Sequence, residues 1–311
     1  MEEFRYIYGP IPSRRLGRSA GISPIMNNTC NQTCIYCQLG RIRHMTNERM
    51  EYVPLQDILD EFSLFAEQEQ GKYDIVTICG DGEPTLYSRL GELIRGLKAR
   101  TDQPVAVITN GGLLYDAQVR SELMEADIVL PSLDAVNQQQ YQKVNRPRKE
   151  IDYYAMLKGL IEFSREYKGQ LWLEIMLVDG YNTDDEDIKA FVSYSHLIRT
   201  DRIYINTPVR CPAESDAKPA APETILKACL AMNAINIDML TSSTYTSDIE
   251  DDYEAYLNIA IRHPLNEEEI RKFLQNRNCQ DIEGFLKRLE SDEQIKVSRQ
   301  GELKTYMVRK A

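Results

Sequence analysis

The sequence predicts an α/β protein in which a partial (βα)6 barrel is followed by a smaller α+β appendage. From about residue 20 to residue 210, short apolar and β-branched runs alternate with longer segments of helical periodicity, which is typical of βα units that build a parallel sheet. After residue 250, three short helical segments and a hairpin pattern replace this alternation. We expect the barrel with an N-terminal extension in residues 1–215, a connecting helix and linker in 216–249, and the appendage in 250–311.

Six segments have the composition of buried strands, because they are almost continuously apolar and rich in β-branched residues. They are Ala20–Ile25, Asp74–Cys79, Val105–Thr109, Ile128–Leu133, Leu171–Val178 and Arg202–Asn206. Five segments between them carry apolar residues at spacings of three and four, and several begin with Asp or Pro, which are favoured at helix starts. These expected helices are Pro54–Gln68, Tyr87–Arg100, Tyr115–Ala126, Ile151–Tyr167 and Asp184–Ile198.

The appendage begins after a proline-rich loop and a polar break. Helical patterns cover Tyr253–Arg262 and Asp281–Glu290, and Asn266 with Glu269 forms a capping-box signature between them. Three short helices followed by a hairpin resemble a winged helix. The hairpin is basic, with Lys296, Arg299, Lys304, Arg309 and Lys310. It therefore suits either a nucleic-acid wing or a module that contacts protein.

Composition limits the class of protein. The chain has 37 basic and 48 acidic residues, a net charge of −11, which argues against a general coating of nucleic acid. Residues 1–50 nevertheless hold seven Arg against three Glu. No apolar run approaches the roughly 20 residues of a membrane span, and no signal segment follows the first residues. We therefore expect a cytoplasmic protein whose seven cysteines are not disulfide-bonded.

Cys30, Cys34 and Cys37 form a C-x3-C-x2-C motif after the first predicted strand. Thiolates so close in sequence can face one metal centre, and three of them leave a fourth position open. On a [4Fe–4S] cluster the open iron can take an external ligand, whereas a structural zinc site needs a fourth protein donor. His44 could be that donor, so a Cys3His zinc site is the alternative.

With Tyr36 before its last cysteine, this motif resembles the signature of the radical S-adenosylmethionine (SAM) superfamily. The resemblance implies a partial barrel in which the three cysteines hold a [4Fe–4S] cluster and SAM chelates its fourth iron. It also implies reductive cleavage of SAM to methionine and a 5′-deoxyadenosyl radical that usually abstracts a substrate hydrogen. Tyr36 is then one of the cofactor-binding residues.

The other expected cofactor-binding residues lie at strand ends, where ligands of parallel sheets bind. Gly82 and Glu83 match the superfamily's Gly-Gly-Glu-type turn, which meets the methionine amino group. By the same resemblance, Asn110 and Ser132 contact the ribose or the methionine, and Asp134 faces the ligand or the substrate.

Arg14, Arg15 and Glu174 are the candidate substrate-binding residues. A rigid Pro-x-Pro segment precedes the two arginines, which brings their guanidinium groups to the expected barrel mouth, ready for phosphate or carboxylate. An ordinary structural salt bridge is their alternative role. Glu174 interrupts an apolar strand, so it either points into the barrel cavity or lies on a solvated edge, and we expect the cavity.

Gly9–Gly17, the turn after Cys79 and Asn206–Arg210 resemble the wyosine-type tRNA-modifying branch of the superfamily. Members of that branch carry additional N-terminal cysteines for a second cluster, whereas no cysteine precedes Cys30 here. The remaining cysteines are dispersed, and we expect buried thiols. They are Cys79, Cys211, Cys229 and Cys279.

The leading functional hypothesis is a radical SAM oxidoreductase or transferase that modifies a macromolecule, with tRNA as the first candidate. One alternative applies the same chemistry to a peptide or protein, including activation of a glycyl-radical partner. A second alternative is a non-catalytic, zinc-containing binding module. The resemblance also implies a flavodoxin or ferredoxin-type electron donor, and no membrane partner is expected.

Overall fold

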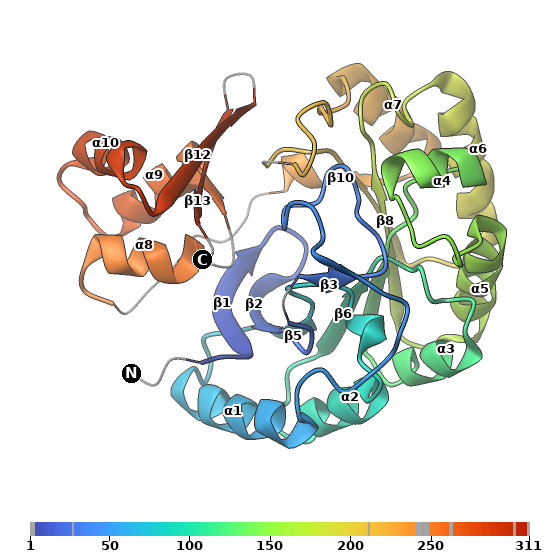
Figure 1. Ribbon diagram of the computed structural model, residues 1–311, viewed down its shortest axis with the longest axis horizontal. Coiled ribbons are helices and arrows are strands. Elements are labelled where there is room, and N and C mark those ends of the chain that lie inside the picture. Colours follow the sequence, from blue (N-terminus) through green and yellow to red (C-terminus); the bar gives the residue numbers. More distant parts are fainter. Residues whose placement is uncertain are drawn as a thin grey trace.

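A computed structural model describes residues 4–26, 28–210, 212–240, 245, 249–260, 264–300 and 303–309, without the side chains of Gln300 and Leu303. Its largest sheet contains eight strands in the order β1-β2-β5-β6-β7-β8-β9-β10. Figure 1 shows the sheet curving around an interior, with the connecting helices on its outer side. Among the described residues, no helix combines the length and the apolar character needed to cross a membrane.

Six parallel strands form the middle of this sheet, which confirms the predicted α/β class. They are β2 (Gly17–Ile22), β5 (Ile75–Ile78), β6 (Val105–Thr109), β7 (Ile128–Pro131), β8 (Gln170–Met176) and β9 (Arg202–Asn206). The first strand begins and ends earlier than predicted. Residues 23–25 lie beyond it, and Pro24 has no amide hydrogen with which to extend a ladder.

Two edge strands were not predicted. β1 (Ile7–Ser13) pairs antiparallel with β2, and β10 (Ile235–Asn236) pairs parallel with β9. β1 contains Pro10 and Pro12, which argue against a central strand but are tolerated at an edge. Its register with β2 shifts between Tyr8 and Ile11, and Ser13 pairs with Gly17. The Arg14–Arg15 turn therefore lies at the amino end of β2, and not at the carboxyl-end mouth where the sequence placed it.

Helices between the strands cover the convex face of the sheet (Figure 1). They are α1 (Leu55–Gln68), α2 (Leu90–Lys98), α3 (Ala117–Leu123), α4 (Gln138–Val144), α5 (Tyr153–Glu166), α6 (Asp185–Leu197) and α7 (Pro222–Met232). The polar sequence of α4 had given no helical signal. α7 lies within the segment for which a connecting helix was predicted.

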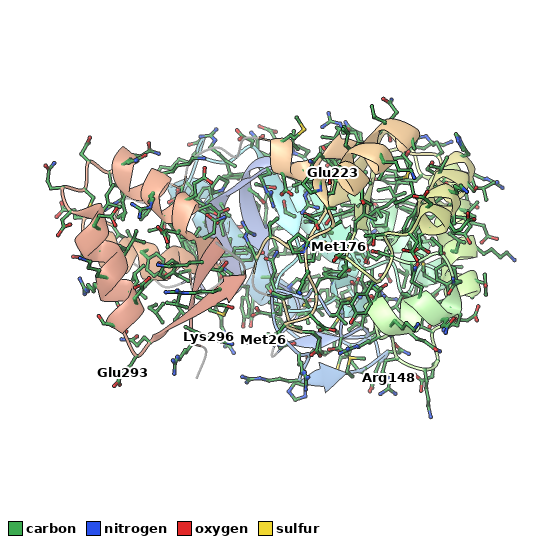
Figure 2. The ribbon with its side chains drawn as sticks, turned by 90° about the horizontal axis from the view of Figure 1, so that it is seen from above. Met26, Arg148, Met176, Glu223, Glu293 and Lys296 are labelled. Atoms are coloured by element: carbon green, nitrogen blue, oxygen red, sulfur yellow. The ribbon has the colours of Figure 1, made fainter. Side chains whose placement is uncertain are left out.

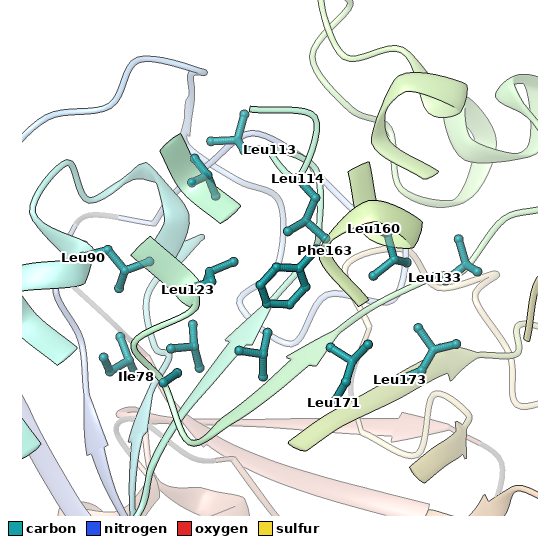
Figure 3. Packing of buried hydrophobic residues seen from close by; sticks show 14 of the residues in the cluster. Ile78, Leu90, Leu113, Leu114, Leu123, Leu133, Leu160, Phe163, Leu171 and Leu173 are labelled. Carbon is teal, nitrogen blue, oxygen red and sulfur yellow. The ribbon is translucent and has the colours of Figure 1, made fainter. Parts of the chain in front are cut away.

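The main hydrophobic core lies between these helices and the sheet. Phe62, Phe163 and Phe191 are fully buried in it, and Figure 3 shows Phe163 facing Leu171 of β8. Burying a side chain of this size stabilises the fold by about 1.5–3 kcal/mol. The strands are almost continuously apolar because the helices bury their outer face.

The inner face of the sheet is apolar at one end and polar at the other. Ile75, Ala106, Ile128, Trp172 and Tyr204, from the first half of their strands, form a second apolar cluster. It fills the barrel near the amino ends of the strands. Polar residues occupy the carboxyl ends, which is where ligands of parallel sheets bind.

The C-terminal part consists of α8 (Asp252–Ala260), β11 (Leu265–Asn266), α9 (Glu267–Asn276), α10 (Ile282–Ser291), β12 (Ile295–Gln300) and β13 (Leu303–Val308). Its strands form an antiparallel sheet, β11-β13-β12, and it has a separate core around Tyr256 and Phe273. The expected capping box between Asn266 and Glu269 is present. The winged-helix interpretation and the boundaries at residues 215 and 249 stay predictions.

Candidate cluster and cofactor site

The three cysteines of the C-x3-C-x2-C motif lie in the loop that follows β2, at the carboxyl end of the sheet. Cys30 is in β3 (Thr29–Cys30), which pairs with β4 (His44–Met45). A tight turn joins the other two, since the Cys37 amide donates to the Cys34 carbonyl at 3.1 Å. All three are free thiols, and burial raises the pKa of each, that of Cys30 to about 12.

The donor set fits an iron–sulfur cluster better than a zinc ion. The charge of Cys37 contributes to the raised pKa of both Cys30 and Cys34, so the three sulfurs face a common region. Yet no three His, Cys, Asp or Glu side chains of the described residues are close enough together to hold a single metal ion. His44, the expected fourth zinc donor, is exposed. Bound iron would supply the positive charge that buried thiolates require.

Amide side chains hold two of the sulfurs. The Asn110 Nδ2 donates to Cys30 Sγ at 3.4 Å, and the Asn145 Nδ2 donates to Cys34 Sγ at 3.6 Å. Asn110 was a predicted site residue at the end of β6, whereas Asn145, which follows α4, was missed. An isolated amide outside any motif carries no sequence signal. Hydrogen bonds to cluster sulfurs are among the means by which proteins tune such clusters.

Gly82 lets the turn after β5 lie directly against the cluster loop. The Glu83 amide donates to the Thr29 carbonyl at 3.2 Å, and the Thr29 amide donates to the Asp81 carbonyl at 3.2 Å. A Cβ on residue 82 would overlap the Thr29 carbonyl. Because the obstruction is backbone, only glycine fits here.

Glu83 is buried, with 2% of its surface exposed, and it organises the turn. Its Oε1 accepts from the Thr85 and Thr109 hydroxyls, each at 2.6 Å, and its Oε2 accepts from the Asn110 amide at 2.8 Å. Burial raises the pKa of Glu83, and these hydrogen bonds oppose that rise. Glu83 lies in the turn after β5, as the sequence predicted. Its carboxylate positions Asn110, which in turn donates to Cys30 Sγ.

Tyr36 and Asp134 form a second buried link between the cluster loop and the sheet. The Tyr36 hydroxyl donates to Asp134 Oδ2, and the Asn145 Nδ2 donates to the same oxygen at 2.8 Å. The other carboxylate oxygen accepts from the Met176 amide at 2.9 Å. Both carboxylate oxygens of Asp134 thus have protein partners, which identifies this residue as a support for the loop.

Ser132 lies beside this network at the end of β7. Its amide donates to the Thr109 carbonyl at 3.1 Å, and it forms an isolated bridge with Glu174. The structure therefore brings together Cys30, Cys34, Cys37, Tyr36, Gly82, Glu83, Asn110, Ser132 and Asp134 along the carboxyl ends of β5, β6 and β7. Each of these residues was predicted from the sequence.

The three expected substrate residues lie on the inner side of the sheet, where Arg15 reaches Glu174 from the turn at the amino end of β2. Arg14 and Arg15 line a cavity of about 170 Å³, and Arg15 forms an ion pair with Glu174. Glu174 also accepts from the Asn206 Nδ2 at 2.9 Å. It points inward, as expected. Arg14 pairs with Asp238 at 2.6 Å, so both arginines also have the structural salt bridge that was their alternative role.

The dispersed cysteines do not gather. Among the described ones, Cys79 lines the cavity, where its sulfur lies 2.9 Å from the Tyr8 hydroxyl. Cys229 is in α7 and Cys279 follows α9. Cys211 lies outside the described residues.

Comparison with known proteins identifies the family. Residues 25–192, more than half of the chain and including the cysteine motif, match the model of the Radical SAM superfamily. The chain belongs to the radical SAM superfamily. This radical SAM protein is accordingly an enzyme whose cofactors are a [4Fe–4S] cluster and SAM.

Its relatives extend the match beyond the barrel. A UPF0026 protein of Methanocaldococcus jannaschii is 32% identical over 93% of this chain and 94% of its own length. The GTPase Obg of Brachyspira hyodysenteriae is 40% identical over 71% of this chain. That match covers only 32% of the GTPase, so the chain spans about a third of that relative.

Solved structures agree on the fold. A radical SAM methyltransferase from Sphaerobacter thermophilus is similar to this chain with a TM-score of 0.55, over 71% of this chain and 67% of that one. Only 14% of the aligned residues are identical. The likeness therefore supports the barrel architecture.

Proposed function

We propose that this radical SAM enzyme modifies a macromolecular substrate in the cytoplasm, with tRNA as the first candidate. The observation that carries the catalytic part is the direct connection between the cysteine loop and the Glu83 turn. Asn110 receives its position from Glu83 through a 2.8 Å hydrogen bond and donates to Cys30 Sγ. The cluster ligands and the strand ends proposed to bind SAM are thus connected by hydrogen bonds.

Cys30, Cys34 and Cys37 would hold the cluster, and the bound cluster supplies the electron that cleaves SAM. Asn110, Ser132 and the backbone of the Gly82–Glu83 turn would hold SAM, because they border the cluster loop at the carboxyl ends of β5 to β7. Tyr36 and Asp134 keep the loop against the sheet. The chain's own residues therefore orient the cofactors before any substrate arrives.

The cavity on the inner face would receive the group that is modified. It is lined by Gln38, which directly follows Cys37, and by Thr77, Ile108 and Asn206 from the ends of three strands. These residues surround the space into which a radical formed at the strand ends would emerge. A bound substrate that filled this space would exclude water from the reactive group.

Exposed cations support tRNA as the macromolecule. Arg43 and Lys149 border the cluster loop, and Lys296 and Arg299 lie on β12. Figure 2 shows Lys296 and Arg148 on one side of the molecule, with Met26 between them and the acidic Glu293 next to Lys296. Exposed cations on an otherwise acidic protein suit a phosphate backbone. A wyosine-type relationship would agree with this choice.

The catalytic proposal is tested by anaerobic reconstitution with iron and sulfide. We expect a brown protein with about four irons per chain, which converts SAM to 5′-deoxyadenosine when reduced. A colourless protein that retains zinc would contradict the proposal. Flavodoxin and ferredoxin are the electron donors to compare with a chemical reductant.

The tRNA proposal is tested separately by binding. We expect affinity for bulk tRNA to fall steeply as salt rises, because phosphate contacts release counter-ions. Binding that ignores salt, together with conversion of a peptide substrate by the reduced enzyme, would instead support the peptide alternative. Products from cell RNA and from peptides would be compared after incubation with the same enzyme preparation.

A further inference from the structure

The cavity on the inner side of the barrel is lined by three guanidinium groups. It lies between the inner face of the sheet, β1 and α9, and its lining includes Arg14, Arg15, Arg210 and Glu269. In about 170 Å³, three cations converge from two segments that are far apart in the sequence. A cavity with this lining is suited to an anion.

Each of these cations has one carboxylate partner, but the partners differ in origin. Asp238, which pairs with Arg14, and Glu174, which pairs with Arg15, belong to η2 (Ile237–Met239) and β8 of the barrel region. Arg210 pairs with Glu269 of α9 at 3.0 Å, a residue 59 positions further along the chain. Glu269 is therefore the carboxylate partner that comes from outside the barrel region.

Arg210 also has an unused donor. Its Nη1 donates to Gln38 Oε1 at 3.4 Å and its Nη2 donates to Glu269, but its buried Nε has no acceptor. A guanidinium carries five N–H donors, and a buried donor without a partner destabilises the protein. An oxyanion with several acceptor atoms could satisfy this donor as well as the one that Glu269 now occupies.

The charges of the three arginines act on one another. Burial, together with the nearby charges of Arg14 and Arg210, lowers the pKa of Arg15 to about 10. Against the effect of burial, Glu269 and Tyr245 in turn raise the pKa of Arg210. An anion that replaced Glu269 would keep this favourable charge, and one with a charge of −2 would also reduce the repulsion on Arg15.

We propose that this cavity binds the phosphoryl group of a nucleotide substrate, which replaces Glu269 as the counter-ion of Arg210. This deepens the proposed function and rests on it, because the bound nucleotide would lie beside the cluster loop through Gln38. A tetrahedral phosphoryl group offers acceptors in several directions and so matches converging arginines, whereas a planar carboxylate matches a single fork. A free mononucleotide and one nucleotide of an RNA chain share this chemistry.

Glu269 can release Arg210 and still cap its helix. Its Oε2 accepts from the Asn266 amide at 2.9 Å, while its Oε1 faces Arg210. The exchange is therefore a swap of ion pairs, with no bond made or broken in either partner. It links substrate entry to the contact between the barrel and the C-terminal part.

The test is calorimetric binding to the reconstituted, unreduced enzyme saturated with SAM, so that the probes cannot occupy the SAM site. The probes are GMP, a single-stranded RNA hexamer, guanosine and acetate. Arg210→Gln should weaken binding of the phosphorylated probes about tenfold or more. Arg18→Gln is the matched control, because Arg18 is an arginine outside the cavity that pairs with Asp74.

Glu269→Gln should strengthen binding of the same probes about tenfold, because the amide no longer competes as an anion and can still cap α9. Glu268→Gln should leave the affinity unchanged, because Glu268, which directly precedes Glu269, pairs with Lys272. A gain of affinity cannot arise from misfolding, so this variant keeps the test decisive if Arg210→Gln folds poorly. A response from GMP alone identifies a free nucleotide as the source, and a response from the hexamer identifies RNA.

Equal binding of GMP and guanosine, competition by acetate as effective as that of GMP, or no response to either variant would overturn the inference. The proposed function fails by a different measurement, namely absence of 5′-deoxyadenosine when the wild-type enzyme is reduced with SAM. Because binding is measured without reductant, the two failures are distinguishable.

Discussion

The cluster edge and the arginine cavity meet at Gln38, but they are held together in opposite ways. At the cluster edge, the carboxylates of Glu83 and Asp134 take most of their hydrogen bonds from hydroxyl and amide donors. In the cavity, Arg14, Arg15 and Arg210 each depend on an ion pair. Neutral donors that the backbone holds in place fix a carboxylate in a single position. An ion pair fixes its two side chains only as long as both partners are present.

This difference separates two tasks. A redox cofactor needs a surrounding that does not change between turnovers, and a dense, fully satisfied network provides rigidity. A substrate must enter and leave, and an ion pair can exchange one anion for another. Four variants distinguish the two regions, and their expected effects decrease from Cys34→Ala to Glu214→Gln.

Replacing Cys34 with alanine should abolish activity, because the two remaining cysteines are too few to bind the cluster. We expect iron content to fall to background and no 5′-deoxyadenosine to form. Cys229→Ala is the control, since this half-buried thiol lies in α7, away from the loop. Full activity in Cys34→Ala would mean that the cluster edge has been assigned to the wrong residues.

Arg15→Met should be the most destabilising change in the cavity. It leaves the Glu174 carboxylate inside the barrel with the Asn206 amide as its hydrogen-bond donor, and removing one member of a buried pair costs about 3–5 kcal/mol. Urea unfolding would measure the loss. The double variant Arg15→Met, Glu174→Leu should recover most of it, and no recovery would show that the two residues act independently.

Glu83→Gln tests the cluster edge without changing its size. The carboxylate accepts from donors on both oxygens, so an amide nitrogen in place of one oxygen must face a donor. We expect a loss of about 2 kcal/mol in stability and weaker SAM binding through the displaced Asn110. Glu92→Gln, at an exposed glutamate of α2, should change neither quantity.

Glu214→Gln is expected to have the smallest effect on stability. It bridges Arg41 and Arg146, whose hydrogen bonds lower its pKa, and its amide donates to the Ile35 carbonyl of the cluster loop at 2.9 Å. Because the folded-state pKa is lowered, the stabilisation is present above the unfolded-state pKa and is lost as pH falls through the folded value. Glu214→Gln should therefore lower the urea midpoint slightly at pH 7.

The same variant and the wild type should converge in acid, once Glu214 is protonated in both the folded and the unfolded protein. Urea midpoints at a series of pH values check this. A difference that grows on acidification would show that the two arginines do not stabilise the carboxylate.

Periodicity and motifs predicted the middle of the sheet and the cysteine loop, because both depend on residues close together in sequence. β1 was missed since Pro10 and Pro12 oppose strand formation, and only the edge position makes them tolerable. Glu83 was predicted as a ligand of SAM, but its hydrogen bonds to the threonines at 85 and 109 depend on the adjacency of β5 and β6.

Long-range pairs gave no sequence signal. Arg15 and Glu174 were each singled out, yet nothing in either segment indicated that they meet. The same holds for Arg210 and Glu269, which lie on different structural units. Asn145 is a further case, because an amide that points at a sulfur looks like any other asparagine in the sequence.

The position of Glu269 makes the barrel depend on the C-terminal part. One carboxylate both caps α9 and neutralises a cation of the barrel. Removal of the C-terminal part would leave the buried Arg210 guanidinium without this counter-ion, so the barrel is expected to be less stable alone than within the whole chain.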